Sequence, residues 1–544
     1  MRKWIPIVIL ASGQFVMTLD TSVMNVSISQ ITADLNTSIQ GVQAAITLYA
    51  LVMAALMLTG AKLGDIYGRN RMFAIGLAVY GVGSLTTALS PSLPVLLVGW
   101  SGIEGLGAIM VIPGIAALTA ANYEGKDRAL AYALIGGITA AAVAVGPLIG
   151  GWVTTNASWR YVFAGETVIV IVIILLRGQI AQAPKADHIP KMDVIGSVLS
   201  VAGLGLAVFG VLMGSKWGFV RPLGAPTING TEITPLGFSV VPFMVLAGLG
   251  ILAGFVQWEE RRHRLGLDRL LDTALLKITR LRAGLTTLLG QQLVLMGLFF
   301  VVPVYLQVVV GLDAFETGKR LIPLSAAMLV AAMAGPKVAG RRSPRMVSQM
   351  GLVLISAGAV VMLATLDVKL NDTGFKIAMV LVGAGGGLLA SQLGNVIMSS
   401  TDASKASETG GLQGTALNLG ASIGTALIGA ILILNLINGF NNKVAENPQV
   451  PAQTREAIAA GTEEGIDIVP AAQVEQLALS KGLSEDQAKA VAADYGDAEL
   501  DALRVSIGAV AAIALLCLWF TRKLPSSGLA GGAAEDVVEK RGAV

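Results

Sequence analysis

Residues 60–71 read GAKLGDIYGRNR and separate the second and third apolar stretches of the chain. Glycines allow two helix ends to meet in a tight turn, and one carboxylate, Asp65, lies near those ends. Arg69 and Arg71 favour the cytoplasmic side of a membrane. Such a short basic loop needs a membrane helix on each side, so this stretch predicts an all-α polytopic membrane protein.

The composition supports this fold class. Hydrophobic residues make up 54% of the 544 residues, charged residues make up 13%, and there are 65 glycines, which membrane helices use for close packing. The net charge of +3 is small and comes from short loops beside apolar segments. We therefore expect a lipid bilayer as the surrounding partner, and no nucleic acid.

The sequence does not indicate metal or enzyme chemistry. The one cysteine, Cys517, lies in the last apolar stretch, and the two histidines, His188 and His263, lie in polar loops. A nucleotide-binding GxxxxGK and a metal-ligand cluster are missing from the sequence, and its apolar helices offer no strand-to-helix turn for a nucleophile elbow. We expect no catalytic residue, no metal and no cofactor, and any buried proton carrier should be a carboxylate.

Apolar segments long enough to cross a membrane recur along the chain. A membrane helix needs about 20 mostly apolar residues. Fourteen segments qualify, namely 4–26, 41–61, 72–89, 93–119, 130–153, 161–176, 195–213, 238–257, 285–310, 321–339, 347–366, 377–398, 410–437 and 505–520. The even count places both termini on the same side of the membrane.

The basic residues indicate which side that is. Arg2 and Lys3 fall on the same side as the basic loops near residues 62–71, 126–128, 177–191, 261–282, 341–345 and 522–523. Basic loops remain cytoplasmic, so both termini are expected in the cytoplasm. The protein itself is expected in a bacterial inner membrane. Lys319 and Arg320 are exceptions, because the count places them near the outer face.

Two polar loops are unusual. The loop 441–504 lies outside by this count and carries twelve acidic residues against five basic ones, a net charge of −7. Ser484 and Gln487 have capping-box spacing, which predicts a short helix starting there and a small helical hairpin. In the cytoplasmic stretch 258–282, leucines interleave with basic residues, as in an amphipathic helix on the inner leaflet.

Four motifs resemble those of one transporter family. The loop 60–71 resembles the helix 2–3 signature of the major facilitator superfamily. Residues 140–151, AAAVAVGPLIGG, and 158–163, SWRYVF, are similar to motifs of its drug/proton antiporters. Residues 19–28, LDTSVMNVSI, are similar to the acidic-Asn pattern of the fourteen-helix branch. Together with the helix count, the motifs cover most of the chain.

The resemblance implies a major facilitator fold, with two six-helix halves and a substrate cavity near the bilayer midplane. The N-terminal half would be 1–177, two inserted helices with their linkers would be 178–283, and the C-terminal half would be 284–544. The last part includes the outer loop 441–504 and a cytoplasmic tail at 521–544.

Two glycine-rich motifs have roles implied by the same resemblance. A conformational switch would comprise Gly60, Gly64, Asp65, Gly68, Arg69 and Arg71. An antiporter motif would comprise Gly146, Pro147, Gly150 and Gly151. Its side-chain-free face would let helix 5 approach the other half and seal the cytoplasmic route when the cavity faces out.

Acids inside the predicted membrane helices are candidate coupling residues. A charged carboxylate there costs at least ~2.5 kcal/mol unless it is partnered or protonated. Asp20 and Glu104 could therefore carry protons or anchor a cationic substrate. Alternatively, Ser22 and Asn25 satisfy Asp20, and Glu104 is a permanently protonated helix contact.

At two positions near or among these acids, the sequence differs from the family pattern. The resemblance places an Arg at the position of Ser101, so the expected cation near Glu104 is missing. Glu166 stands where relatives usually have Asn, at the outer end of helix 6. It is as compatible with a structural ion pair to Arg160 as with a role in transport.

Neutral polar side chains complete the expected cavity. The candidates are Asn25, Ser101, Gln291, Gln292, Tyr305, Gln307, Gln392, Asn395, Gln413 and Asn418. A cavity with few acids and an adaptable apolar lining fits amphipathic or lipophilic substrates better than sugars.

These features lead to three hypotheses. The first is proton-coupled efflux of hydrophobic or cationic amphipathic compounds by alternating access, with the proton gradient as the energy source and the protein as a monomer. The second is an exporter or flippase of an endogenous lipid or metabolite, with a periplasmic or cell-wall partner at the outer loop. The third is a non-transporting receptor or scaffold, which would not need the two glycine-rich motifs.

Overall fold

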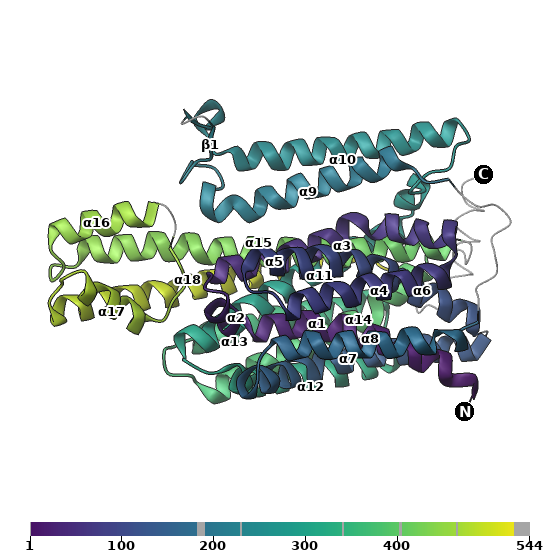
Figure 1. The fold of residues 1–544 in the computed structure, drawn as a ribbon, viewed down its shortest axis with the longest axis horizontal. Coiled ribbons are helices and arrows are strands. Elements are labelled where there is room, and N and C mark those ends of the chain that lie inside the picture. Colours follow the sequence, from purple (N-terminus) through teal and green to yellow (C-terminus); the bar gives the residue numbers. More distant parts are fainter. Residues whose placement is uncertain are drawn as a thin grey trace.

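Helices form almost the whole of the computed structural model, which describes residues 2–123, 125–181, 191–228, 231–339, 342–401, 405–463 and 466–526. Expected features such as Lys185, His188 and the tail beyond residue 526 lie outside the described residues. A helix satisfies its own backbone hydrogen bonds, as a hydrocarbon surrounding requires. The long helices run roughly alongside one another in a bundle (Figure 1).

The first half contributes six long helical segments within the described residues. They are α1 (Ile5–Val26), α3 (Ile39–Tyr67), α4 (Arg69–Ala88), the continuous run of α5 (Leu93–Leu96), η2 (Leu97–Glu104) and α6 (Gly105–Asn122), then α7 (Gly125–Asn156) and α8 (Arg160–Leu176). Short turns flank them at η1 (Arg2–Trp4), α2 (Ile28–Asp34) and η3 (Arg177–Gln179). The segment η2 is π-helical, a form that is frequent at functional sites.

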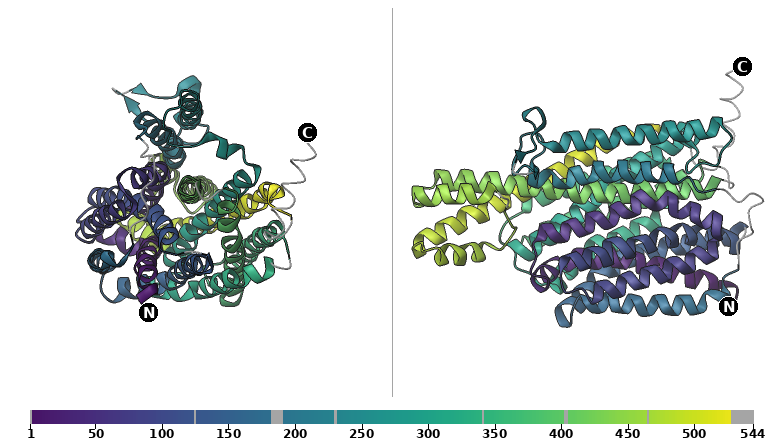
Figure 2. Two further views of the ribbon diagram at one scale, coloured as in Figure 1. Left: turned by 90° about the vertical axis from the view of Figure 1, so that its right-hand side faces the viewer. Right: turned by 45° about the horizontal axis from the view of Figure 1, so that its top comes forward.

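Two inserted helices follow the first half. They are α9 (Val194–Trp217) and α10 (Val240–Arg264), connected through the antiparallel strands β1 (Thr227–Ile228) and β2 (Thr231–Glu232) and the turn η4 (Pro235–Gly237). The turn η5 (Thr273–Lys277) leads into the second half. Figure 2 shows the inserted pair at the edge of the bundle, where α9 contacts α3 and α15 (Ala406–Glu446).

The second half contains the remaining helices. Besides α15 they are α11 (Thr279–Val304) with the π-helical η6 (Tyr305–Val309), α12 (Ala314–Ala339), α13 (Pro344–Thr365), α14 (Asp372–Met398), α16 (Ala452–Glu463), α17 (Ala471–Ser480), α18 (Glu485–Phe520) and η8 (Thr521–Lys523). Two helix pairs join this half to the first, α7 with α12 and α3 with α15. In the second pair, Gln43 donates to the Thr425 carbonyl at 2.9 Å, and Ser422 donates to the Thr47 carbonyl at 2.8 Å.

Twelve helices in the described part of the chain are long and apolar enough to cross a membrane. They correspond to twelve of the fourteen expected segments. The other two, 72–89 and 321–339, are also helical, within α4 and α12, but are not in this set. Glycine and hydroxyl side chains recur along α4, and α12 carries three charged residues near its start. The all-helical membrane fold is thus confirmed, with twelve clearly apolar helices.

Both ends of the described chain lie at one end of the bundle (Figure 1). There the Tyr123 hydroxyl donates to the Lys3 carbonyl at 3.0 Å, and Asn70 donates to the Ile180 carbonyl at 3.2 Å. We call it the basic end because its helix termini carry Arg69, Arg71, Arg177, Arg262, Arg282, Arg345 and Arg522.

The two basic residues expected at the opposite end are neutralised locally. Lys319 forms an ion pair with Glu316, one turn earlier on α12. Arg320 forms an ion pair with Asp372, at the start of α14. Paired charges of this kind explain why the two residues depart from the charge distribution of the other helix ends.

The helices of 441–504 project beyond the bundle at the end opposite to the basic end (Figure 1). The capping box is confirmed, because the Ser484 hydroxyl accepts from the Gln487 N–H at 3.3 Å and the Gln487 side chain accepts from the Ser484 N–H at 3.1 Å. The expectation that this helix is short is wrong. It is α18, which continues for 36 residues into the last apolar segment. Phe440 packs edge-on against Tyr495 and braces α15 against α18.

The surface helix expected at 258–282 is not formed. α10 runs into this stretch and ends, and Gly266 adopts a φ of 66°, which turns the chain toward η5. Leu270, Leu271 and Leu275 are buried in the main hydrophobic core. Leu270, Leu271 and Leu275 therefore pack a linker inside the protein, whereas Leu265 and Leu267 remain exposed.

Candidate functional site

Three acids from separate helices meet inside the first half. α1 supplies Asp20, η2 supplies Glu104 and α8 supplies Glu166, and one carboxylate oxygen of each lies within 4.8 Å of the others. Their side chains are 0%, 0% and 1% exposed. The structure thus brings together all three acids that the sequence analysis selected. We call them the acid cluster.

Neutral donors surround the acid cluster. The indole N–H of Trp100 donates to Asp20 Oδ1 at 2.8 Å. The hydroxyls of Tyr80 and Ser84 donate to Glu166 Oε2 at 3.2 and 3.1 Å. None of the ion pairs found among the described residues includes an acid of the cluster.

Several oxygens of the cluster have no hydrogen-bond partner. They are Asp20 Oδ2, both carboxylate oxygens of Glu104, and Glu166 Oε1. Three ionised carboxylates this close would repel one another strongly in a low-dielectric interior. Protons shared among them would remove the repulsion and supply the missing hydrogen bonds. The spacing would also suit a hard cation, but shared protons would satisfy the same oxygens, and we assign no metal here.

Helix backbones close the walls of the cluster. A Cβ at Gly83 would overlap the backbone of Glu104, so α4 lies directly on η2. A Cβ at Gly107 would likewise overlap the backbone of Tyr80. The acid cluster is therefore buried within one half, where α4 packs on η2 and α6 with no side chain between them at these two glycines.

The partners expected for Asp20 lie elsewhere. Asn25 donates to the Thr21 carbonyl at 2.8 Å, and Ser22 packs against Gly146 of α7. At 3.6 residues per turn, positions two and five residues beyond Asp20 lie on other faces of α1. The alternative in which these two side chains satisfy Asp20 is therefore not supported.

The structural ion pair considered for Glu166 is not formed. Arg160 donates to the carbonyls of Ala88 and Ser90, and its guanidinium lies 4.5 Å from the ring centroid of Trp159. Six residues separate Arg160 from Glu166, which places them on different faces of α8. Arg160 instead satisfies the carbonyls where α4 ends.

Sequence reasoning missed the residues that surround the cluster. Besides Tyr80 and Ser84, these are Trp100 and Tyr49, whose rings stack at a centroid distance of 4.6 Å and an interplanar angle of 6°. A signal was available, because a Tyr or Trp in an apolar segment needs a partner for its polar atom. A buried acid of the second half, Glu499 of α18, was also missed because it falls in the segment assigned to the outer loop.

The residues of the antiporter motif lie on α7 between α1 and α12. They are Gly146, Pro147, Gly150 and Gly151. A Cβ at Gly150 would come within 2.8 Å of Val23 on α1. A Cβ at Gly151 would overlap the backbone of Ala314 on α12, in the other half. The missing side chains let α7 approach both neighbours, as small residues do in membrane bundles.

The connection predicted at 60–71 is shorter than expected. α3 continues to its end at Tyr67, and Gly68 alone, with a φ of 95°, joins it to α4. That left-handed conformation favours glycine. Asp65 Oδ1 pairs with Arg69 at 3.1 Å and ties the two helices together. The other switch residues, Gly60, Gly64 and Arg71, lie on the same two helices.

The neutral polar residues that were expected to line the cavity differ in their surroundings. Some are packed inside one half, and others form contacts between the two halves. Seven are buried, namely Asn25, Ser101, Gln291, Tyr305, Gln307, Gln392 and Asn418. Among these, Gln307 of η6 joins the halves by donating to the Val26 carbonyl at 2.8 Å and accepting from the Ser29 N–H at 3.3 Å. Gln292 and Gln413 are half-buried, and Asn395 is exposed.

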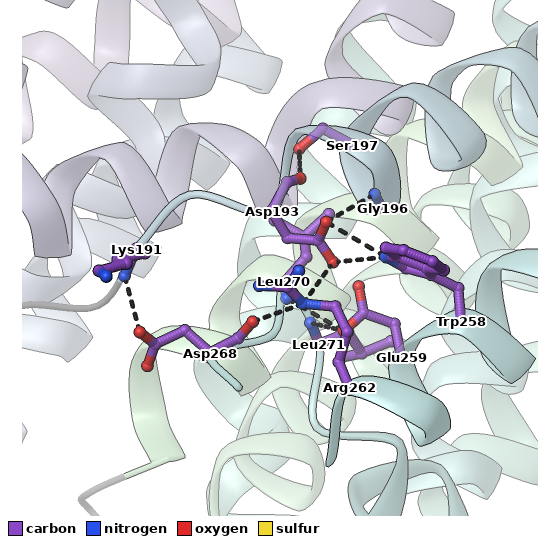
Figure 3. A network of polar contacts seen from close by, with 10 residues as sticks. All are labelled: Lys191, Asp193, Gly196, Ser197, Trp258, Glu259, Arg262, Asp268, Leu270 and Leu271. Carbon is purple, nitrogen blue, oxygen red and sulfur yellow. Dashed lines mark hydrogen bonds and ion pairs between the residues drawn. The ribbon is translucent and has the colours of Figure 1, made fainter. Parts of the chain in front are cut away.

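A second polar network ties the inserted helices together at the basic end (Figure 3). Asp193 caps α9 by accepting from the Gly196 N–H at 2.9 Å. It also accepts from Trp258 at 3.0 Å and pairs with Arg262 at 3.2 Å. Glu259, which is buried, accepts from a backbone N–H of the following linker at 3.1 Å. The network holds α9, α10 and the linker in one arrangement.

The same linker is bound to the second half through Asp272. Lys405, at the start of α15, donates to Asp272 at 2.5 Å, and Arg269 pairs with it at 3.1 Å. The Asp272 N–H donates to Glu408 of α15 at 3.2 Å. Burial acts to raise the pKa of Asp272, but the hydrogen bonds from Lys405 and the Ala274 N–H outweigh it and hold the pKa below its ordinary value.

Comparisons with known proteins agree with this architecture. The family model described as Major Facilitator Superfamily matches residues 10–425. The tetracenomycin C resistance and export protein of Streptomyces glaucescens is 28% identical over 96% of this chain and 92% of its own length. The probable actinorhodin transporter of Streptomyces coelicolor is 26% identical over 79% and 72%. The multidrug efflux pump LfrA of Mycolicibacterium smegmatis is 25% identical over 88% and 90%.

A solved structure has the same fold. A bacterial homologue of the human lysosomal transporter Spinster, in an inward-facing and unoccupied conformation, matches with a TM-score of 0.58 at 15% identity, over 96% of this chain and 98% of that one. Family, relatives and fold identify a transporter and not an enzyme. With most of its length matched, this chain belongs to the Major Facilitator Superfamily.

Proposed function

We propose that the protein exports hydrophobic or cationic amphipathic compounds in exchange for protons, by alternating access of its two halves. The acid cluster carries this proposal, because three buried carboxylates with no cationic partner need protons. The relatives named above are called a probable actinorhodin transporter, a tetracenomycin C resistance and export protein and a multidrug efflux pump, which supports a drug-like substrate class over an endogenous lipid.

Protons and substrate would occupy different places. The cluster lies inside the first half, closed by the backbones of α4 and η2, so an organic cation would not reach it. The more accessible polar groups, Gln292, Asn395 and Gln413, lie in the second half and are candidates for the substrate path. Exchange would then be coupled through conformation rather than through direct competition at one carboxylate.

Alternating access would use fourteen helices, with the basic end in the cytoplasm and the helices of 441–504 outside. The close contact of Gly151 with Ala314 lies near the last turn of α7 and the first turn of α12, which is the end opposite to the basic end. This supports a seal on the outer side in the present conformation, rather than the cytoplasmic seal expected from the motif. Asp65 and Arg69 would reorganise at the basic end when that side closes.

A reconstituted system tests the function. Purified protein in liposomes should move a cationic dye against a concentration gradient when a proton gradient is imposed, and an ionophore that removes the gradient should stop it. A fluorescent lipid in the same vesicles should not change leaflet faster than in protein-free vesicles. Dye movement that ignores the proton gradient would reject antiport, and accelerated lipid movement would favour the flippase alternative.

A further inference from the structure

Trp100 occupies an unusual position beside the acid cluster. It is 0% exposed and lies on the π-helical segment η2, about one turn before Glu104. Its indole nitrogen donates to Asp20 Oδ1 at 2.8 Å, and an indole N–H can only donate. The stacked ring of Tyr49 fixes the plane of the indole and so the direction of this hydrogen bond.

The neighbouring residue does not share this role. Ser101 donates to the Ala45 carbonyl of α3 at 2.9 Å, so its hydroxyl is already used. A cation at that position would hold an acid in its ionised form. A neutral N–H favours the ionised carboxylate less strongly and leaves it able to take up a proton.

The titratable groups that act on Asp20 come from several helices. They are Tyr49 of α3, Tyr80 of α4, Glu104 of η2 and Glu166 of α8. Of the other helices packed on α1, α6 has no titratable side chain and α7 presents Gly146 and Gly150. The charged residues of α11 and α12 lie near the ends of those helices. Trp100 is thus the stronger of two side-chain donors to Asp20, the other being Tyr49, beside two neighbouring acids.

We propose that Trp100 is the positioning residue of the proton site, which holds Asp20 toward Glu104 and Glu166 and sets the pH at which Asp20 exchanges its proton. The inference rests on the proposed proton coupling. In this proposal the neutral hydrogen bond from Trp100 acts on the acid in place of the arginine that the resemblance places at the adjacent position, Ser101.

Two substitutions of opposite chemistry test the role. Trp100→Phe keeps a ring against Tyr49 but removes the N–H, so the midpoint of the pH dependence of efflux should move up by about one unit. Trp100→Arg supplies a cation and should move the midpoint down. Trp519→Phe, on an exposed tryptophan of α18, is the matched control and should not move it. Shifts in the same direction for both Trp100 variants, or no shift, would reject the role.

A spectroscopic test does not depend on transport. Part of the tryptophan emission of the purified protein should change with pH. Trp100→Phe should remove this change and Trp519→Phe should keep it. Asp20→Asn should also abolish it, because the partner of Trp100 can then no longer titrate. The Asp20→Asn measurement leaves Trp100 in place, so it remains decisive if the Trp100 variants fail to fold. Unchanged titration in Asp20→Asn would overturn the proposal. Emission that follows these expectations while efflux ignores the gradient would reject antiport but support the Trp100–Asp20 pair.

Discussion

At the scale of single residues, the acid cluster is set apart by what surrounds it. Most of the ion pairs in the described chain lie at helix ends, where water is near, and surface pairs contribute little to stability. Asp20, Glu104 and Glu166 have only neutral donors and lie in the interior. Protonation is the least costly way to keep these carboxyl groups buried. Substitutions by the corresponding amides, which are neutral at every pH, are therefore informative.

Glu104 is the sharpest test, because neither of its carboxylate oxygens has a hydrogen-bond partner. Glu104→Gln keeps the shape of the side chain but cannot exchange a proton. We expect gradient-driven efflux to be lost while substrate binding, measured by dye fluorescence, is retained. Glu499→Gln, at a buried acid outside the cluster, is the matched control and should export normally. Wild-type efflux by Glu104→Gln would exclude the residue as a carrier.

The pKa of Asp272 gives a prediction for the linker at the basic end. Because its pKa is lowered in the folded protein, its contacts stabilise the fold above the unfolded value near 3.8, and this contribution disappears as the pH falls through the folded pKa. Asp272→Asn should therefore melt at a lower temperature than wild type at pH 7, and the difference should shrink below about pH 4. A constant difference across this range would show that the charge of Asp272 is not the cause.

At the scale of elements, α7 connects the first half with the second. One of its faces packs on α1 next to Asp20, and the other meets α12 through Gly151. The backbone of Ala314 leaves no room for a side chain at Gly151, whereas a Cβ at Gly137 of the same helix would meet no atom within 4 Å. This helix therefore contains both a sensitive glycine and a tolerant one.

Gly151→Ala should separate α7 from α12 at the end opposite to the basic end. Overpacking of this kind costs about 1–3 kcal/mol, enough to change a two-state equilibrium roughly tenfold. A cysteine introduced at the buried Thr317 of α12, in a Cys517→Ala background, should then react faster with a membrane-impermeant maleimide from the outside. Gly137→Ala should leave the rate unchanged. Equal rates in both variants would mean that the glycine contact does not seal this side.

At the scale of the whole molecule, the helices of 441–504 belong to the second half but touch the first. α15 and α18 form their base, braced by Phe440 and Tyr495. Gln40 of α3 donates to the Ile466 carbonyl at 2.5 Å, which links the projecting region to the first half. A region fixed to one half and contacting the other would change its contacts whenever the halves rock.

Replacing 451–483 with a flexible linker should keep the fold and membrane insertion, because the pairing of α15 with α18 does not need α16 or α17. Export should fall or change in substrate preference, since the contact of Gln40 is lost. Gln40→Ala, which removes that contact alone, should give part of the same effect. Efflux equal to wild type for every dye would show that the region does not take part, and loss of folding would show a bracing role instead.

The positions of the helices follow from the sequence because membrane crossing is a local requirement. About 20 apolar residues and basic flanks are sufficient, and they located every long helix, including α4 and α12, which are less apolar. Local chemistry also predicted the capping box of Ser484. Patterns that depend on their surroundings were less informative, and the leucines of 258–282, for example, fit a membrane surface as well as a packed linker.

The fold class, the helix segments and the three candidate acids can be inferred from the amino-acid sequence alone. That Asp20, Glu104 and Glu166 share one site is visible only in the folded protein, because they come from α1, η2 and α8 and lie as much as 146 residues apart. The same holds for Trp100, for the close approach of Gly151 to Ala314, and for the unbroken length of α18. Such contacts depend on how helices pack against one another, and the packing of distant helices leaves no local pattern of residue spacing.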